Sequence, residues 1–391
     1  MSKAKRNLLW RDAFLCTCLT SAVTLFFYFL FVNVSFLDPF EKAFEDFSFN
    51  DLYYSEGFYE PVTTKEIVLV NVKQAGRFEL AQAIQQVAQA NPKVIGIDLV
   101  FRDLKEPYAD SLLREALQLP RVVTAFYSDD TAIVTNHDYF RGADAREGFV
   151  NLDQPDGGRV IREFTGMRNG EGGMEWSFPA RLAALADEGE AGKVDVQLLF
   201  HPKPIDYQIG NQQFLTLDID EVLQSESLPV VENAVVIFGY LGTPTGNPND
   251  IEDKHFTPMN PAIAGRSAPD MYGVEIHGNI TYMLLHNRFL MGIPTWVVYL
   301  VAFLCCMLSI KGAMQLYVRN EFWFDILAKV IQLSLSVILV YLTLLLLKSG
   351  IHVRITPVLI LVLLGFEMIG YYEYLVVYLK KRYSWESYLL D

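Results

Sequence analysis

The sequence is poor in cysteine and in positive charge. It has four cysteines among 391 residues, Cys16, Cys18, Cys305 and Cys306, so the long stretch 37–291 contains none. Disulfides therefore do not staple that stretch. It also carries 20 Lys and Arg against 39 Asp and Glu, whereas nucleic-acid binding requires a face of clustered positive charge. We therefore exclude DNA and RNA as partners.

The short motifs of common enzymes are missing as well. The sequence contains no GxSxG elbow, no HExxH helix and no GxxxxGK[ST] phosphate loop. The five histidines of residues 37–291 are too scattered to define a catalytic triad. We therefore expect a protein that is not an enzyme and that uses no cofactor.

Long apolar runs, in contrast, are abundant. A hydrocarbon core about 30 Å thick needs roughly 20 apolar residues in one helix. Four runs meet this length, and we expect them to be transmembrane helices at residues 13–36, 292–310, 328–347 and 355–379. The chain between and around them then forms a tail at 1–12, a water-exposed domain at 37–291, loops at 311–327 and 348–354, and a tail at 380–391.

Basic residues beside the spans predict the orientation, because Lys and Arg are retained on the cytoplasmic side. Nine of them would share one side: Lys3, Lys5, Arg6, Arg11, Lys311, Arg319, Lys380, Lys381 and Arg382. We therefore expect both termini in the cytoplasm and residues 37–291 outside it. The first span is longer than the apolar core of a signal peptide and has no small-x-small cleavage site, so we expect an uncleaved anchor.

The domain alternates strand-like and helix-like segments. We expect strands at 66–72 (EIVLVNV), 93–101 (KVIGIDLVF), 121–127, 194–200 and 234–240 (AVVIFGY), and helices at 78–87, 112–117, 177–186 and 274–285. The first strand, helix and strand predict a right-handed βαβ unit with a parallel pair. The fold class is therefore α/β, with a mixed, mainly parallel sheet beside a four-helix transmembrane region. The irregular stretch 242–272 follows a buried strand, at the edge where open α/β sheets commonly place ligands.

Several of these blocks occur in an order that resembles a known family. They are EIVLVNV, VIGIDLVF, GFVNLDQPDGGRVIREF (148–164), IDYQIG (205–210), VLQSESLP, AVVIFGY, DKHFTP (253–258) and YGVEIHGNITYMLL (272–285). The series is similar to the CHASE2 domain, an extracytoplasmic sensor module of bacterial kinases and cyclases, which typically has one span before it and three after it. The chain departs from the family at QAGR (74–77), which replaces a tryptophan-proline segment, and in an enlarged loop before DKHFTP.

The resemblance implies a location and a role. The location is the bacterial cytoplasmic (inner) membrane, with the domain periplasmic or extracellular. Because only about a dozen residues follow residue 379, we expect any signal to pass to a separate polypeptide.

Four residues form the densest group of candidate ligands: Asp253, His255, Glu275 and His277. A set of histidines and carboxylates suits a divalent metal. Against this, a helix through 275–277 would point those two side chains apart, and hydrogen bonding of Asp253 and His277 to the loop backbone is the alternative.

Two further candidates follow a Pro-Asp-Gly turn: Arg159 and Arg162 would bind a carboxylate or phosphate, or form structural salt bridges. The turn itself does not match a calcium loop, since Asp153 and Asp156 lack the spacing and the closing glutamate.

The fourth span contains Glu367 near its middle. An ionised carboxylate in hydrocarbon is costly, so we expect it to be protonated, paired or turned to the bundle interior. We favour a hydrogen-bonded contact with a partner or with Ser334 or Ser336 of the third span. A pump is not expected, because no central base matches this single acid.

Three functions remain open. The first is a stand-alone membrane sensor or adaptor that recognises an envelope ligand or protein and relays this to a partner in the membrane or cytoplasm. The second is a structural subunit of an envelope, secretion or transport complex. The third is an extracytoplasmic metal-dependent hydrolase that uses residues 253–277.

Overall fold

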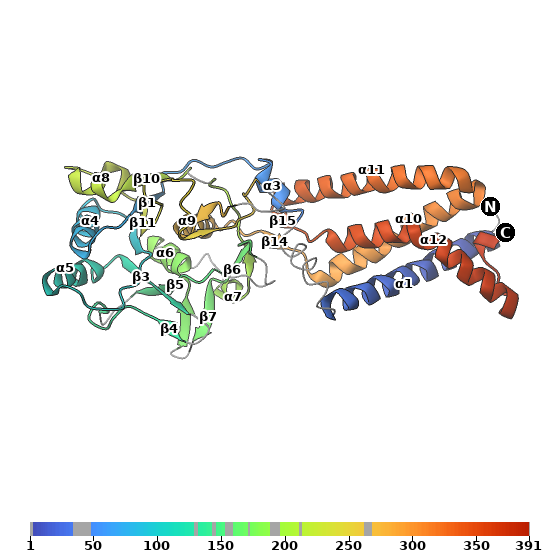
Figure 1. Cartoon of the computed structure of the whole chain (residues 1–391), viewed down its shortest axis with the longest axis horizontal. Helices are drawn as coiled ribbons and strands as arrows, with labels where there is room; N and C mark the ends of the chain where they lie inside the picture. Colours follow the sequence, from blue (N-terminus) through green and yellow to red (C-terminus); the bar gives the residue numbers. More distant parts are fainter. Residues whose placement is uncertain are drawn as a thin grey trace. The chain divides into compact units, whose positions relative to one another are not determined.

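A computed structural model describes residues 3–33, 48–128, 132–142, 146–152, 159–170, 173–187, 196–210, 213–261 and 268–390 (Figure 1). The chain divides into two compact units. One comprises Met1–Tyr53 with Met291–Asp391, and the other is Tyr54–Leu290. Each unit is described by itself.

The second unit is an α/β domain built on a seven-stranded sheet. Its spatial order is β10-β1-β11-β2-β3-β4, and β5 also pairs with β3. All pairs are parallel except β3 with β4, so the sheet is mixed and mainly parallel, as predicted. The strands are β1 Ile67–Asn71, β2 Val94–Ile97, β3 Val122–Ser128, β4 Ile133–Val134, β5 Glu147–Phe149, β10 Leu215–Asp218 and β11 Val235–Gly239.

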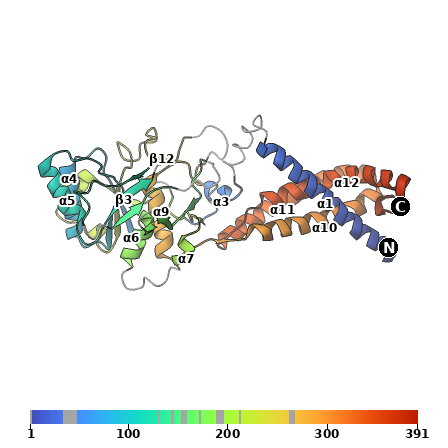
Figure 2. The same ribbon diagram turned by 90° about the horizontal axis from the view of Figure 1, so that it is seen from below.

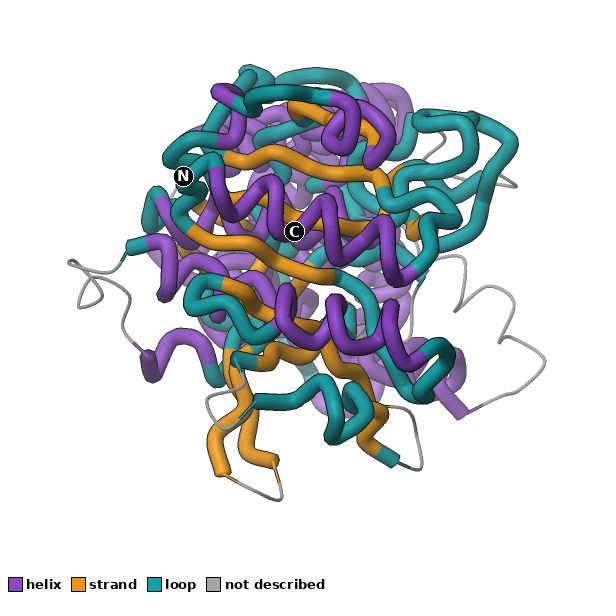
Figure 3. Tube along the Cα trace, turned by 90° about the vertical axis from the view of Figure 1, so that its left-hand side faces the viewer, coloured by secondary structure: helices purple, strands orange, loops and turns teal. Residues whose placement is uncertain are grey.

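Helices cover both faces of the sheet, because its central strands are apolar on both sides. On one face Val68 and Val70 of β1 pack with α4 Arg77–Gln89, α5 Pro107–Leu117 and α8 Ile219–Gln224. Figure 3 shows helices in front of the strands from this side. On the other face Ile67 and Leu69 pack with α6 Phe178–Ala186 and α9 Gly273–Leu285. The alternation of β1 side chains between two cores thus produces three layers.

Two sequence predictions about this domain are wrong. Strands β1 and β2 are parallel but are not neighbours, because β11, which lies far along the chain, pairs with both of them. The expected strand at 194–200 is instead the short helix α7 Val196–Leu199 within its described part.

The remaining elements of the domain are short. They are β6 Glu163–Phe164, β7 Met167–Gly170, β8 Gly173–Trp176, β9 Lys203–Pro204, the 3₁₀ helix η2 Pro229–Val231, β12 Lys254–His255 and β13 Met271–Tyr272. β12 and β13 pair antiparallel and lead directly into α9. Helix α3 Asp51–Ser55 lies where the chain passes from one unit to the other.

The first unit is a helical bundle. Among the residues that the structure describes, four helices are long and apolar enough to cross a membrane: α1 Lys3–Asn33, α10 Thr295–Arg319, α11 Glu321–Lys348 and α12 Thr356–Tyr383. They fit a membrane protein, and each extends beyond its predicted span on at least one side. α1 and α10 pack against α12, and Figure 2 shows α1 crossing them obliquely.

The connections to the domain meet at one end of this bundle. Here β14 Met291–Gly292 pairs with β15 Ile351–His352, in the connection between α11 and α12. The Asn50 side-chain nitrogen lies 2.9 Å from His352 Nε2 and donates to the Val353 carbonyl at 3.2 Å. Asn50 and β14 therefore lie at the same end of the bundle as the 348–354 loop.

At the other end, the last described residues fold back onto α1. Asp12 is fully buried and accepts hydrogen bonds from the Ser387 hydroxyl and the Tyr388 amide, both at 2.7 Å. The 3₁₀ helix η3 Tyr388–Leu390 packs into the bundle core as a result. The segment expected as a simple tail is thus part of the folded bundle.

Candidate functional site

Polar side chains gather at the carboxyl ends of the central parallel strands. β1 ends at Asn71, β10 at Asp218 and β11 at Gly239, while Asp98 directly follows β2. Because parallel strands place their carboxyl ends at one edge of a sheet, residues from distant segments meet there. We call this the carboxyl edge.

Asn71 organises the carboxyl edge. Its buried amide donates to the Gly242 carbonyl at 2.9 Å and to the Thr245 hydroxyl at 2.8 Å. Its oxygen accepts from the Leu241 amide at 2.9 Å and from the Lys73 amide at 3.1 Å. One side chain thus fixes the segments that follow β1 and β11.

Lys73 and two carboxylates extend this arrangement to β10. Lys73 Nζ lies 3.0 Å from Asp218 and 2.8 Å from Asp220. Partial burial alone would raise the pKa of Asp218, but hydrogen bonds from Thr245 and Lys73 hold it below its ordinary value. The Asp220 and Asp218 carboxylates raise the pKa of Lys73 in turn. Three of the parallel strands are therefore tied together by polar groups at one edge.

The enlarged loop after β11 folds over this edge. The Tyr240 hydroxyl donates to Asp250 at 2.6 Å, and the Thr243 amide donates to the same carboxylate at 3.1 Å. Lys254 Nζ lies 4.7 Å from the centre of the Tyr272 ring. These contacts hold the loop against the carboxyl edge as far as β12. Asp253, directly before β12, and His255, at its end, therefore lie at the carboxyl edge.

Asp98 and Asp253 form an acidic pair within the site. Desolvation, together with the nearby Asp253 carboxylate, raises the pKa of Asp98 to about 8. Desolvation and the neighbouring Glu252 raise the pKa of Asp253 to about 6, although 45% of its side chain remains exposed. Two carboxyl groups that disfavour ionisation this strongly are typical of binding or catalytic sites. Asp98 falls inside the strand expected at 93–101, and its position as the first polar side chain after VIGI was the signal that could have identified it.

The predicted group of four residues is brought together only in part. His255 Nε2 lies 3.9 Å from Asp253 Oδ1, and desolvation lowers the pKa of His255. Glu275 instead accepts the Tyr272 amide at 3.1 Å and so caps the start of α9. Its carboxylate has a structural role.

His277 lies behind the site rather than in it. It is buried against Phe178, with ring centres 5.6 Å apart. Burial and the nearby His255 lower the pKa of His277 to about 3, so the ring is neutral near pH 7. Its Nδ1 has no hydrogen-bond partner among the residues described. The predicted hydrogen bond from His277 to the loop backbone is therefore not made by Nδ1.

The described residues do not form a metal-binding cluster. Within the part of the chain that the structure describes, no three His, Cys, Asp or Glu side chains are placed to hold a metal ion.

Of the two arginine candidates, Arg159 lies beside the loop that contains Phe256, whereas the backbone of Arg162 contacts Ile205. Arg159 lies over Phe256, 6.0 Å from the ring centre, and Ile161 donates its amide to the Phe256 carbonyl at 2.8 Å. The Arg162 carbonyl accepts from the Ile205 amide at 2.8 Å. Arg159 thus contacts Phe256, the residue that follows His255. Asp153 and Asp156 lie outside the described residues.

Glu367 has partners that differ from those predicted. Lys329 of α11 forms an ion pair with it, and the Gln332 amide donates to it at 3.2 Å. Ser336 instead donates to the Gln332 carbonyl of its own helix at 2.8 Å. The expectation that Glu367 is paired and contacts the third span is therefore confirmed, but Ser336 is not its partner, and the expectation of an acid without a matching base is wrong. The sequence showed Lys329 at the start of a span, but not its alignment with Glu367.

Comparison with known proteins supports the resemblance seen in the sequence. The family model of the CHASE2 domain matches residues 23–311, which is most of the chain and includes the whole α/β domain. No curated protein and no solved structure matches the chain. This family is one of extracytoplasmic sensor domains. The chain belongs to the CHASE2 domain family.

Proposed function

We propose that the chain is a membrane-anchored sensor whose α/β domain recognises its ligand at the carboxyl edge. The family match supports the sensory role. The observation that carries the placement is the meeting of Asp98, Asp253 and His255 at the edge where α/β sheets bind ligands, since Asp253 lies 3.9 Å from His255 and interacts electrostatically with Asp98. A carboxyl pair of this kind suits a ligand that presents a positive charge or several hydrogen-bond donors.

The topology belongs to the same proposal. Both termini lie in the cytoplasm and the domain lies outside the cytoplasmic membrane of a bacterium, in keeping with the basic residues at one end of the spans. The bundle transmits the state of the domain to a separate protein. The alternative is a docking subunit of an envelope, secretion or transport complex, in which the domain binds a protein and no small ligand.

A thermal-shift experiment tests the ligand site. The purified full-length chain, in lipid nanodiscs, is mixed with a low-molecular-weight extract of its own cell envelope. A ligand at a hundred times its Kd stabilises the folded state by about 2.7 kcal/mol, which corresponds to an increase in Tm of roughly 5–10 °C for a domain of this size. We expect this increase for the parent chain and its loss in the double variant Asp98→Asn with Asp253→Asn.

The matched control is Asp138→Asn, because the Asp138 side chain is 97% exposed and lies outside the site. It should respond like the parent chain. An equal increase in Tm in the double variant would contradict the carboxyl edge as the site. Copurification from gently solubilised membranes then separates the two functions, since a kinase, cyclase or regulator favours sensing and a secretion or transport assembly favours docking.

A further inference from the structure

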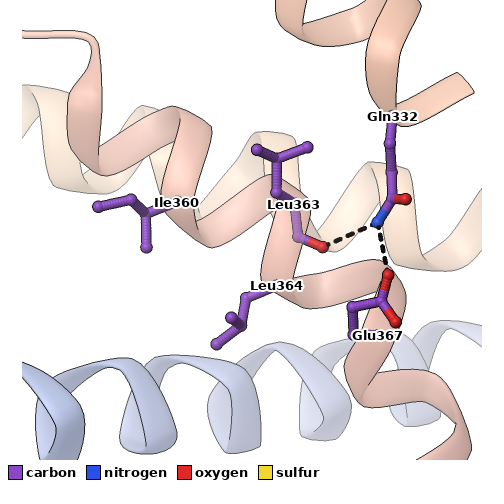
Figure 4. A pocket seen from close by; sticks show the side chains of 5 residues that line it. All are labelled: Gln332, Ile360, Leu363, Leu364 and Glu367. Carbon is purple, nitrogen blue, oxygen red and sulfur yellow. Dashed lines mark hydrogen bonds between the residues drawn. The ribbon is translucent and has the colours of Figure 1, made fainter. Parts of the chain in front are cut away.

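An ion pair joins two of the membrane-crossing helices on the exposed surface of the bundle. Lys329 of α11 pairs with Glu367 of α12, and Gln332 donates to Glu367 and to the Leu363 carbonyl. Figure 4 shows the Gln332 amide reaching from its helix toward both acceptors. We call these three residues, Lys329, Gln332 and Glu367, the α11–α12 patch.

The charges of the patch are not covered by the bundle. The Lys329 side chain is 64% exposed and the Glu367 side chain 52% exposed. Both contacts to Glu367 use Oε1, which leaves Oε2 without a partner among the described residues. Hydrocarbon offers neither donors nor acceptors, so an exposed ion pair at this depth costs free energy unless further polar groups reach it.

A hollow beside the patch gives this surface a shape. It has a volume of about 420 Å³ and is lined by Gln332, Ile360, Leu363, Leu364 and Glu367. Its walls are apolar except at the end formed by Gln332 and Glu367, as Figure 4 shows. Such a surface fits an apolar helix that also brings charged groups to one depth.

We propose that the α11–α12 patch is the interface with a second copy of this chain. In a two-fold dimer about an axis along the membrane normal, each residue and its counterpart lie at the same depth. Lys329 and Glu367 already share one depth, because they touch. Each lysine can therefore meet the glutamate of the other copy without any shift of the helices.

Charge complementarity favours a second copy over an unrelated helix. The patch carries one positive and one negative group, so it is its own complement under two-fold rotation. A second Lys–Glu pair supplies a donor to the open Oε2 and a carboxylate to the remaining protons of Lys329. Ile360 and Leu364 of the second copy would lie beside its ion pair and would fill the hollow of the first copy.

Charge reversal in the full-length chain tests this directly. Two differently tagged copies are coexpressed, transferred with native lipid into nanodiscs, and captured through the first tag. Lys329→Glu in both copies places like charges together, and Glu367→Lys in both does the same. We expect each to reduce recovery of the second copy at least tenfold.

The decisive sample combines one copy of each variant. Lys329→Glu in one copy then faces Glu367→Lys in the other, which restores opposite charges only across the interface. Recovery should return to within twofold of the parent chain, which also shows that both variants are folded. Leu364→Trp, which fills the hollow, should reduce recovery, whereas Leu300→Trp on the exposed side of α10 should not.

Three results would overturn the proposal. The first is that tagged parent copies are not recovered together. The second is that the single reversals associate as well as the parent chain. The third is that the mixed reversal pair stays dissociated while Leu364→Trp behaves like Leu300→Trp, in which case the patch faces lipid or another protein.

Discussion

Replacement of Asn71 by alanine tests how the carboxyl edge is held together. Asn71 is fully buried, and three of its hydrogen bonds join the end of β1 to residues 241–245, at Leu241, Gly242 and Thr245. Alanine removes both the amide and the oxygen. The Leu241 amide and the Gly242 carbonyl would then lose their contacts to this side chain.

The expected loss follows from these contacts. Each hydrogen bond contributes about 1 kcal/mol net, and a buried group left without a partner costs roughly 1–3 kcal/mol. With some compensation by water, Asn71→Ala should lower the free energy of unfolding of the domain by about 3–5 kcal/mol. This is a large part of the 5–15 kcal/mol that is typical of a folded domain.

Hydrogen exchange monitored by mass spectrometry provides the assay, on the full-length chain in nanodiscs. Weakening of the edge by about 3 kcal/mol should speed exchange of the Leu241 amide roughly a hundredfold. Asn151→Ala is the matched control. Asn151 is another asparagine whose side chain hydrogen-bonds the backbone, with the amide and the carbonyl of Ser128 at 2.9 and 2.7 Å. This variant should affect exchange at Ser128 and leave Leu241 unchanged.

A free-energy change below about 1 kcal/mol with unaltered exchange at Leu241 would contradict this role of Asn71. The same conclusion holds if Asn151→Ala speeds exchange at Leu241 as much as Asn71→Ala does. In either case Asn71 would not be the residue that fixes the loop after β11.

Three other predictions concern single residues. The pKa of Asp98 is raised to about 8, from about 3.9 in an unfolded chain, so only the folded state holds this proton between these values. Stability should therefore fall as pH rises from about 4 to 8, and Asp98→Asn should flatten this fall in a Tm series. Asp12→Ala removes the acceptor of Ser387 and of the Tyr388 amide and should loosen residues 384–390 by about 2–4 kcal/mol, seen as faster exchange at Tyr388; unchanged exchange there would contradict the contact. Gly148→Ala would place a Cβ 2.5 Å from the Phe178 backbone and should lower the free energy of unfolding by about 1–3 kcal/mol, measured as a lower Tm. Gly76→Ala, with only the flexible Glu79 carboxylate at 3.5 Å, should have a small effect.

The sequence predicted local features of this fold well. The β-branched runs in β1, β3 and β11 are apolar on both faces, and this identifies buried parallel strands. The four spans were readable because their length alone separates them from core helices. The order of the strands could not be read, since the placement of β11 between β1 and β2 depends on contacts between segments about 140 and about 170 residues apart.

The candidate site was predicted in part for the same reason. Asp253 and His255 were identified from their alternation along the chain, and they do lie together. Asp98 was missed, because its importance comes from the nearness of Asp253, which no local pattern encodes. Lys329 and Glu367 lie on different helices, so their pairing depends on how α11 packs against α12.

Thiol labelling in intact cells tests most directly whether the CHASE2 domain lies outside the cytoplasm. The four native cysteines lie within α1 and α10, and they define the background. With a membrane-impermeant maleimide, Asp138→Cys in the domain should be labelled in intact cells. Lys381→Cys, at the end of α12, should be labelled only after the cells are permeabilised. Labelling of Lys381→Cys but not Asp138→Cys in intact cells would contradict the account.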